Sequence, residues 1–373
     1  GTGNIDFDAI VGGGNPLGKV TVSSAGTITS DLAFSAAGLE WTSTGVTLLD
    51  GLVTSTEVVK LTAGGIDVDA GITAAGFEVE LNSSNGLTID GGAITTTGGN
   101  NTAAGVIDIN TSNGNTVINS SLIAQGGTAT GTNAGAAGGV VTIDTGAGDT
   151  VTFGSGADIN TSGSAASGTN QASAIGGAVT INTGDALITL TDTTITTSQG
   201  AATGSGTATA TGGTVTFSDE VALAGGGVTI TTGATGGNIL FSDTLNGTQT
   251  LGLTAGTGNI DFDAIVGGGN PLGAVTVSSA LNLTADNAFS SDSFIQSAGS
   301  GTSTFNGSTT VSGANGFNVT GTNLALNGSL ASSTTGSVIT DLSGTLVISD
   351  AGDVTTNSGS VTFDADGGIT TGG

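Results

Sequence analysis

Hydrophobic and polar residues alternate in a short phrase that recurs along this chain. Each phrase consists of a glycine, one variable residue, and two β-branched or aromatic residues separated by a polar or small one. The phrase begins at Gly3, Gly18, Gly105, Gly139, Gly177, Gly213, Gly237, Gly258 and Gly359. Alternation with a period of two predicts β-strands, with Ile5 and Phe7 pointing inward and Asp6 pointing outward.

The spacing between phrases predicts how the strands connect. Gly237 and Gly258 are 21 residues apart, and Gly3 and Gly18 are 15 apart, which is more than a β-hairpin needs. Such intervals fit one coil of a parallel β-solenoid, with short strands and tight corners. The sequence therefore predicts an all-β protein, a right-handed parallel β-helix forming an elongated rod, since parallel crossovers are right-handed by default.

Some intervals are longer, at 34 to 38 residues, and the extra length consists of small residues. These segments are Gly127–Gly139, Ser164–Gly177 and Ala201–Gly213, and they occupy equivalent places between phrases. We expect them to form repeated loops on one side of the solenoid.

A much longer repeat is also present. Residues Gly1–Gly18 return without change at Gly256–Gly273, and the match continues to Ala25 and Ala280 with Lys19 replaced by Ala274. We expect one continuous β-solenoid over residues 1–373, with a first long repeat at 1–255 and the start of a second copy at 256–373. Because residue 1 falls on the repeat boundary, we expect the chain to be an excerpt of a longer protein.

Composition limits the function classes that are open. The chain has 70 glycines, no cysteine and no histidine, and its only cationic side chains are Lys19 and Lys60, giving a net charge of -27. That charge repels phosphate backbones, so we expect no nucleic-acid partner. Every apolar run is too short to span a bilayer, so we expect no membrane insertion. A mean hydropathy of +0.29 still allows a buried core, unlike the composition of a disordered chain.

Asp-x-Asp pairs are the sharpest candidates for chemistry. Residues i and i+2 of a strand share a face, so both carboxylates of a pair would point outward, where calcium prefers oxygen ligands. The candidate calcium ligands are Asp6, Asp8, Asp67, Asp69, Asp261, Asp263, Asp364 and Asp366. The alternative is that these carboxylates only keep a β-rod soluble and block lateral strand pairing.

Side-chain types argue against two further activities. Paired carboxylates serve glycoside hydrolysis, but the chain lacks the tyrosine, arginine and histidine of a sugar-cleaving groove, so we expect no enzyme. Threonine tracts such as Thr207–Thr211 and Thr229–Thr231 could form a hydroxyl array for ice, but outward positions are too irregular. Trp41 is open to two interpretations, a loop contact or a core cap.

The phrase GGxVTIxTG, separated by Gly/Ala/Thr/Ser loops in an acidic, cysteine-free chain, resembles filamentous-haemagglutinin-like exoproteins and autotransporter passengers of Gram-negative bacteria. The resemblance covers essentially the whole chain and implies an extracellular right-handed β-helix that acts as an adhesin, stalk or fibre. The Asn-Pro-Asn-Leu signature of such secretion domains is missing, because Gly13–Gly18 reads GGNPLG, so no export route is implied.

Together these observations predict a non-enzymatic structural or adhesive fibre segment of a long bacterial surface protein, located outside the cell. Its expected partners are neighbouring copies or coils of the same protein and a host or neighbouring-cell surface. The alternative is a self-assembling filament or sheath subunit that stacks head to tail through its end coils, because neither end of the sequence resembles a polar capping coil.

Overall fold

The structure is a computed structural model that describes residues 1–204 and 209–372. The described residues form strands and turns without any helix, and the parallel strands stack as a β-solenoid of about 16 turns. The all-β parallel solenoid predicted from the sequence is thereby confirmed. The chain divides into two compact units: unit 1 is Gly1–Thr189 with Thr193–Gly213, and unit 2 is Leu190–Asp192 with Thr214–Gly373.

In unit 1 each turn supplies strands to parallel sheets, which we name after their first strands. The β1 sheet contains β1 (Ile5–Phe7), β3 (Ile28–Ser30), β6 (Val46–Leu49), β9 (Gly65–Val68), β12 (Leu87–Ile89), β15 (Thr116–Ile118) and β18 (Val151–Phe153). The β2 sheet contains β2 (Val20–Ala25), β5 (Leu39–Ser43), β8 (Val59–Ala63), β11 (Val79–Ser83), β14 (Ile107–Thr111), β17 (Val141–Thr145) and β20 (Val179–Asn182). The β4 sheet contains β4 (Phe34–Ala36), β7 (Val53–Ser55), β10 (Ile72–Ala74), β13 (Ile94–Thr95), β16 (Leu122–Ile123), β19 (Ile159–Asn160) and β22 (Thr194–Thr196).

Unit 2 is built in the same way, and β21 (Ile188–Thr191) contains residues of both units. The β23 sheet contains β23 (Val215–Phe217), β26 (Ile239–Phe241), β29 (Ile260–Phe262), β31 (Leu283–Ala285), β33 (Thr302–Phe305), β36 (Asn323–Leu326), β39 (Thr345–Ile348) and β42 (Gly368–Thr371). Strand β24 (Val221–Ala224) pairs with β27 (Leu245–Asn246). A second ladder contains β25 (Gly227–Thr231), β28 (Thr250–Thr254), β30 (Leu272–Ser279), β32 (Phe289–Gln296), β35 (Phe317–Gly321), β38 (Val338–Leu342) and β41 (Val361–Ala365), and a third contains β34 (Thr309–Val311), β37 (Leu330–Ser332) and β40 (Val354–Thr356). Strand β32 pairs with both β34 and β35 and so joins these two ladders.

The alternating phrases form the strands as predicted. Val141 lies opposite Val179 in the adjacent turn and both are fully buried, whereas Thr142 points outward and is partly exposed. The 15-residue spacing does not mark a full turn, because Gly3 and Gly18 precede two strands of one turn, β1 and β2. Ile5 pairs instead with Ile28, so that turn takes 23 residues.

Aromatic side chains stack along the core. In unit 2 the rings of Phe217, Phe241 and Phe262 lie nearly parallel, with centroids 5.0 and 5.3 Å apart. In unit 1 Trp41 is 1% exposed and packs against Phe34, with a centroid distance of 5.0 Å. Trp41 is therefore a core residue and not a loop contact.

The duplicated sequence folds alike locally but is buried differently. Gly12 and its equivalent Gly267 both adopt the left-handed backbone that favours glycine, with φ of 68° and 69°. Within the described ranges, strand β1 pairs with β3 alone and its Phe7 is partly exposed, whereas β29 pairs with both β26 and β31 and its Phe262 is 1% exposed. Burial of the duplicated residues thus depends on the turns beside them.

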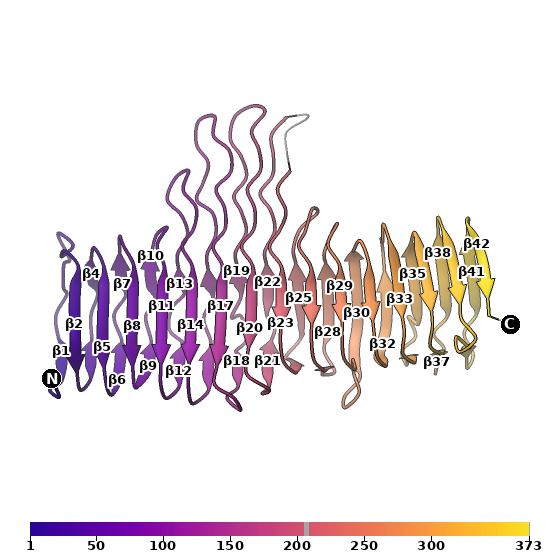
Figure 1. The fold of residues 1–373 in the computed structure, drawn as a ribbon, viewed down its shortest axis with the longest axis horizontal. Helices are drawn as coiled ribbons and strands as arrows, with labels where there is room; N and C mark the ends of the chain where they lie inside the picture. The colour runs from indigo at the N-terminus through magenta and orange to yellow at the C-terminus, as the bar shows by residue number, and fades with distance from the viewer. Residues whose placement is uncertain (205–208, 373) are drawn as a thin grey trace. The chain divides into compact units, whose positions relative to one another are not determined.

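The predicted small-residue loops follow β16, β19 and β22 and project from one side of unit 1 (Figure 1), as expected. A shorter loop after β13, residues 97–104, joins them, and we name the described parts of these loops the fin. Residues 205–208, which include Thr207 of the threonine tract, lie outside the described residues.

The fin loops are hydrogen-bonded to one another. The Gly98 amide donates to the Gln125 carbonyl at 3.0 Å, and the Gly126 amide donates to the Ser162 carbonyl at 2.9 Å. Close stacking of neighbouring loops explains the glycines, because a Cβ added to Gly127 would overlap the Gly99 carbonyl of the preceding loop. The fin is thus a stacked extension of the solenoid, held by backbone hydrogen bonds.

A buried threonine closes the base of several fin loops. The Gly177 amide donates to the Thr161 carbonyl at 2.7 Å, and the Thr161 hydroxyl donates to the Gly177 carbonyl at 2.6 Å. Thr96 with Gly105 and Thr197 with Gly213 form the same two-bond neck. A loop that leaves and returns at one neck does not disturb the register of the adjoining strands.

We expect Thr161→Val to weaken this neck. The substitution keeps the side-chain volume but removes a buried hydroxyl donor, which costs about 1–2 kcal/mol. Hydrogen exchange of the Gly177 amide should accelerate, whereas Thr161→Ser should retain its protection. Equal exchange rates in the wild type and both variants would contradict a stabilising role of the Thr161 hydroxyl at the neck.

Candidate functional site

Aspartates stack at the corner that follows the β1 sheet. Successive turns place Asp8, Asp31, Asp50, Asp69 and Asp90 directly after paired strand residues, and we call these five the aspartate stack. Neighbouring strands lie about 4.8 Å apart, so each carboxylate has a like charge one turn away.

Two of the predicted Asp-x-Asp pairs gain a third carboxylate from this stack. Asp6 and Asp8 meet Asp31, and in each group one oxygen per residue lies within 4.8 Å of the others. Asp67 and Asp69 meet Asp90 in the same way. Asp31 and Asp90 were not predicted, because their only signal in the sequence is that each follows a strand at the same place, one turn later.

The surroundings of these two groups disfavour the charged form of their carboxyl side chains. Partial burial, then the charges of Asp69 and Asp90, raises the pKa of Asp67. A hydrogen bond shared with the Asp69 carboxyl, followed by desolvation, raises the pKa of Asp90. One oxygen of Asp67 is buried without a hydrogen-bond partner among residues 1–204 and 209–372. Desolvation, then the charge of Asp8, likewise raises the pKa of Asp6.

The other two Asp-x-Asp pairs, Asp261 with Asp263 and Asp364 with Asp366, lie in no such three-carboxylate group within the described part of the chain. Burial raises the pKa of Asp261, although a hydrogen bond with Thr284 opposes the shift. Asp364 lies opposite Asp341 across β38 and β41.

Unit 2 places asparagines at the corner that follows the β23 sheet. Asn306 donates its side-chain amide to Asp286 at 2.9 Å, and Asn327 donates to Asn306 at 2.8 Å. Asparagine therefore supplies hydrogen-bond donors between stacked turns, which the carboxylates of the aspartate stack cannot do at neutral pH.

The two carboxylate groups offer the hard oxygen ligands that calcium prefers, with water completing its six to eight ligands. A cation would also offset the repulsion between stacked charges. The alternative assignment, that the carboxylates are exposed charges that keep the surface soluble, stays open.

We expect the melting temperature of the wild type to be higher in calcium than in chelator. A ligand that binds only the folded state stabilises it by about 2.7 kcal/mol when its free concentration is 100 times its dissociation constant. Asp90→Asn should melt higher than the wild type in chelator, since it removes repulsion, yet gain less from calcium. Thermal unfolding in both conditions measures this, with Asp353→Asn as a control that removes an exposed charge elsewhere. An identical wild-type melting temperature throughout would rule the site out.

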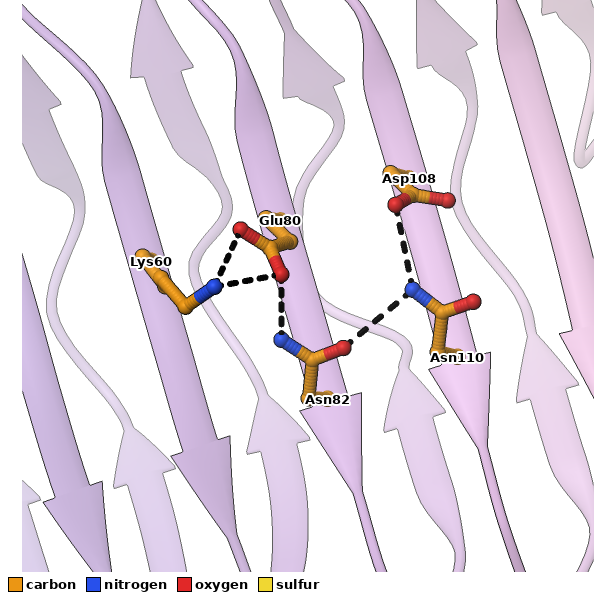
Figure 2. A network of polar contacts seen from close by, with 5 residues as sticks. All are labelled: Lys60, Glu80, Asn82, Asp108 and Asn110. Carbon is orange, nitrogen blue, oxygen red and sulfur yellow. Dashed lines mark hydrogen bonds and ion pairs between the residues drawn. The ribbon is translucent and has the colours of Figure 1, made fainter.

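A second polar arrangement lies on the outward face of the β2 sheet (Figure 2). Lys60 contacts both carboxylate oxygens of Glu80 at 2.6 and 2.7 Å, and Asn82 donates to Glu80 at 2.8 Å. Asn110 donates to Asn82 at 3.2 Å and to Asp108 at 3.1 Å, so the network crosses three adjacent strands. The other lysine, Lys19, pairs with Glu40 at 2.7 Å.

These contacts shift the titration of the paired groups. The hydrogen bond to Glu80 raises the pKa of Lys60, even though desolvation opposes it. Partial burial works to raise the pKa of Glu80, but hydrogen bonds from Lys60 and Asn82 outweigh it and lower that pKa.

We expect Lys60→Met to destabilise the protein by about 0.2–1 kcal/mol at neutral pH, the range of partly exposed ion pairs. Because the pKa of Glu80 is lowered on folding, its contribution is present above the unfolded value of about 4.3 and is lost as pH falls through the folded value. Denaturant unfolding at pH 7 and at successively lower pH should therefore show the wild-type advantage shrinking in acid. An advantage that persists unchanged at pH 2 would contradict the ion pair.

The threonine tract Thr229–Thr231 forms no uninterrupted hydroxyl row, since Thr229 lies opposite Gly252.

No helix among residues 1–204 and 209–372 is long and apolar enough to cross a membrane. Comparison of the chain with protein-family models, curated proteins and solved structures found no match.

Proposed function

We propose that this chain is a non-enzymatic structural and adhesive segment of a long, repetitive extracellular protein. The observation that carries the proposal is the architecture within each unit, where every turn buries its inward side chains against the next turn. Such a solenoid grows by adding turns, because each repeat contacts only its neighbours. The duplicated Gly1–Gly18 sequence is consistent with growth of this kind.

The outward surface supports a role in contact with other molecules. The fin extends from unit 1 on loops that leave the strand register intact, and loops on rigid scaffolds commonly carry binding functions. The resemblance to filamentous-haemagglutinin-like exoproteins and autotransporter passengers suggests a bacterial cell surface as its location. Host or neighbouring cells, and further copies of the same protein, are the proposed partners.

Antibodies raised against the purified chain test this location. We expect them to label intact, unpermeabilised cells and to detect, after strong denaturation, a polypeptide much larger than 35.0 kDa. Labelling only after permeabilisation would overturn an extracellular role. A surface-exposed polypeptide near 35.0 kDa that polymerises would favour the alternative, a head-to-tail filament or sheath subunit.

Adhesion is tested separately with beads coated with the folded chain. We expect these beads to bind cells more than beads carrying heat-denatured chain, since binding depends on the arrangement of outward side chains. Equal binding by both preparations would leave a structural role without adhesion.

A further inference from the structure

A groove runs along the corner that follows the β2 sheet, and we call it the corner groove. It has a volume of about 690 Å³, within the usual range of ligand sites, about 300–1,000 Å³. Five successive turns line it with short segments that end β5, β8, β11, β14 and β17. The lining is Ser43, Thr44, Thr62–Gly64, Asn82–Ser84, Asn110–Ser112 and Asp144–Gly146.

The register places one outward polar side chain per turn along this groove. Thr62 lies opposite Asn82, Asn82 opposite Asn110, and Asn110 opposite Asp144. Adjacent turns are about 4.8 Å apart, so hydrogen-bonding groups recur at that interval. The groove is therefore a row of similar polar positions and differs from a single pocket with one centre.

The polar groups have capacity left for a ligand. The Thr62 and Ser112 hydroxyls make no hydrogen bond within the described residues. The network in Figure 2 fixes the Asn82 and Asn110 side chains through their amide nitrogens and leaves the Asn110 carbonyl oxygen available. Asp144 accepts from Asn182 through one of its two oxygens. Side chains held by one another are preorganised, which lowers the entropy cost of binding.

The lining also selects the chemical class of the ligand. No lysine lines the groove, and the net charge of -27 opposes a polyanion. Asp144 is the one carboxylate in the lining, so the groove lacks the ligand set of a cation site. An extended peptide repeats at about 3.3 Å per residue and usually binds a free strand edge, whereas β8, β11 and β14 are paired on both sides.

We propose that the corner groove binds a linear neutral polysaccharide, with successive sugar rings alongside successive turns. Sugar hydroxyls would hydrogen-bond to the amides and hydroxyls of the lining, and sugar C–H groups would pack against the threonine methyls and Ala63. A pyranose ring with its linkage advances a chain by nearly the rise of one turn, so contacts can repeat without strain. The inference rests on the proposed adhesive function for its biological setting only, and it deepens that function by naming a ligand class.

Isothermal titration of the full chain with cellohexaose, chitohexaose and mannohexaose tests the proposal, with heparin and a neutral Ser/Thr peptide as comparison ligands. The combined variant Thr62→Val, Asn110→Ala, Ser112→Ala removes three lining groups, and we expect it to lower the affinity for the hexasaccharide that binds by at least tenfold. Thr142→Ala is the matched control, because Thr142 lies on the same sheet face outside the groove lining. Thermal unfolding of each variant verifies that it is folded.

Binding of at least one neutral hexasaccharide, lost in the combined variant and kept in Thr142→Ala, supports the proposal. Absence of binding by all three hexasaccharides, equal binding by the combined variant, or preferential binding of heparin or the peptide overturns it. If the combined variant fails to fold, the single variant Thr62→Val, which removes a hydroxyl that makes no hydrogen bond, decides by the same criterion with a smaller loss. These outcomes do not depend on cell-surface labelling, so failure of the groove and failure of the proposed location are distinguishable.

Discussion

Parallel strands stacked in register are the constraint on which the rest of this structure depends. Each side chain lies about 4.8 Å from the residue at the same position one turn away, so chemical character accumulates along rows. Val141 above Val179 adds buried apolar area, and Phe217 above Phe241 adds ring stacking. The same rule applies outside the core, where rows of polar side chains are formed whether or not their charges are compatible.

The corner rows of the two units differ in whether their stacked side chains attract or repel one another. Asn327 above Asn306 forms a hydrogen bond, because an amide is both donor and acceptor. Asp69 beside Asp90 is unfavourable when both are charged, and the pKa of Asp90 is raised by a hydrogen bond shared with Asp69, then by desolvation, then by the charge of Asp69. The raised values mean that these carboxylates oppose folding at neutral pH unless protons or cations offset their repulsion. A cation bound between neighbouring carboxylates of the row would offset this repulsion.

The strands, the parallel solenoid and three of the four fin loops could be predicted, because alternation and spacing are properties of neighbouring residues. The third carboxylates, Asp31 and Asp90, could not, since the turn length that aligns them varies from one coil to the next. Ile5 pairs with Ile28 after 23 residues, whereas Leu39 pairs with Val59 after 20. The contact between Lys60 and Glu80 escaped prediction for the same reason. Composition also gave no sign that the fin loops would hydrogen-bond to one another.

The register constraint also explains where variation is allowed. Only ladder positions must match the next turn, so a segment that leaves and returns at one neck can lengthen freely, as between Thr161 and Gly177. Outward positions are similarly free to vary, and the outward face of the β2 sheet carries Lys60 on β8 but Asn82 on β11 and Asn110 on β14. Inward side chains therefore determine the stability and the length of the solenoid. The fin and the corner groove can acquire binding functions without disturbing the stacked core.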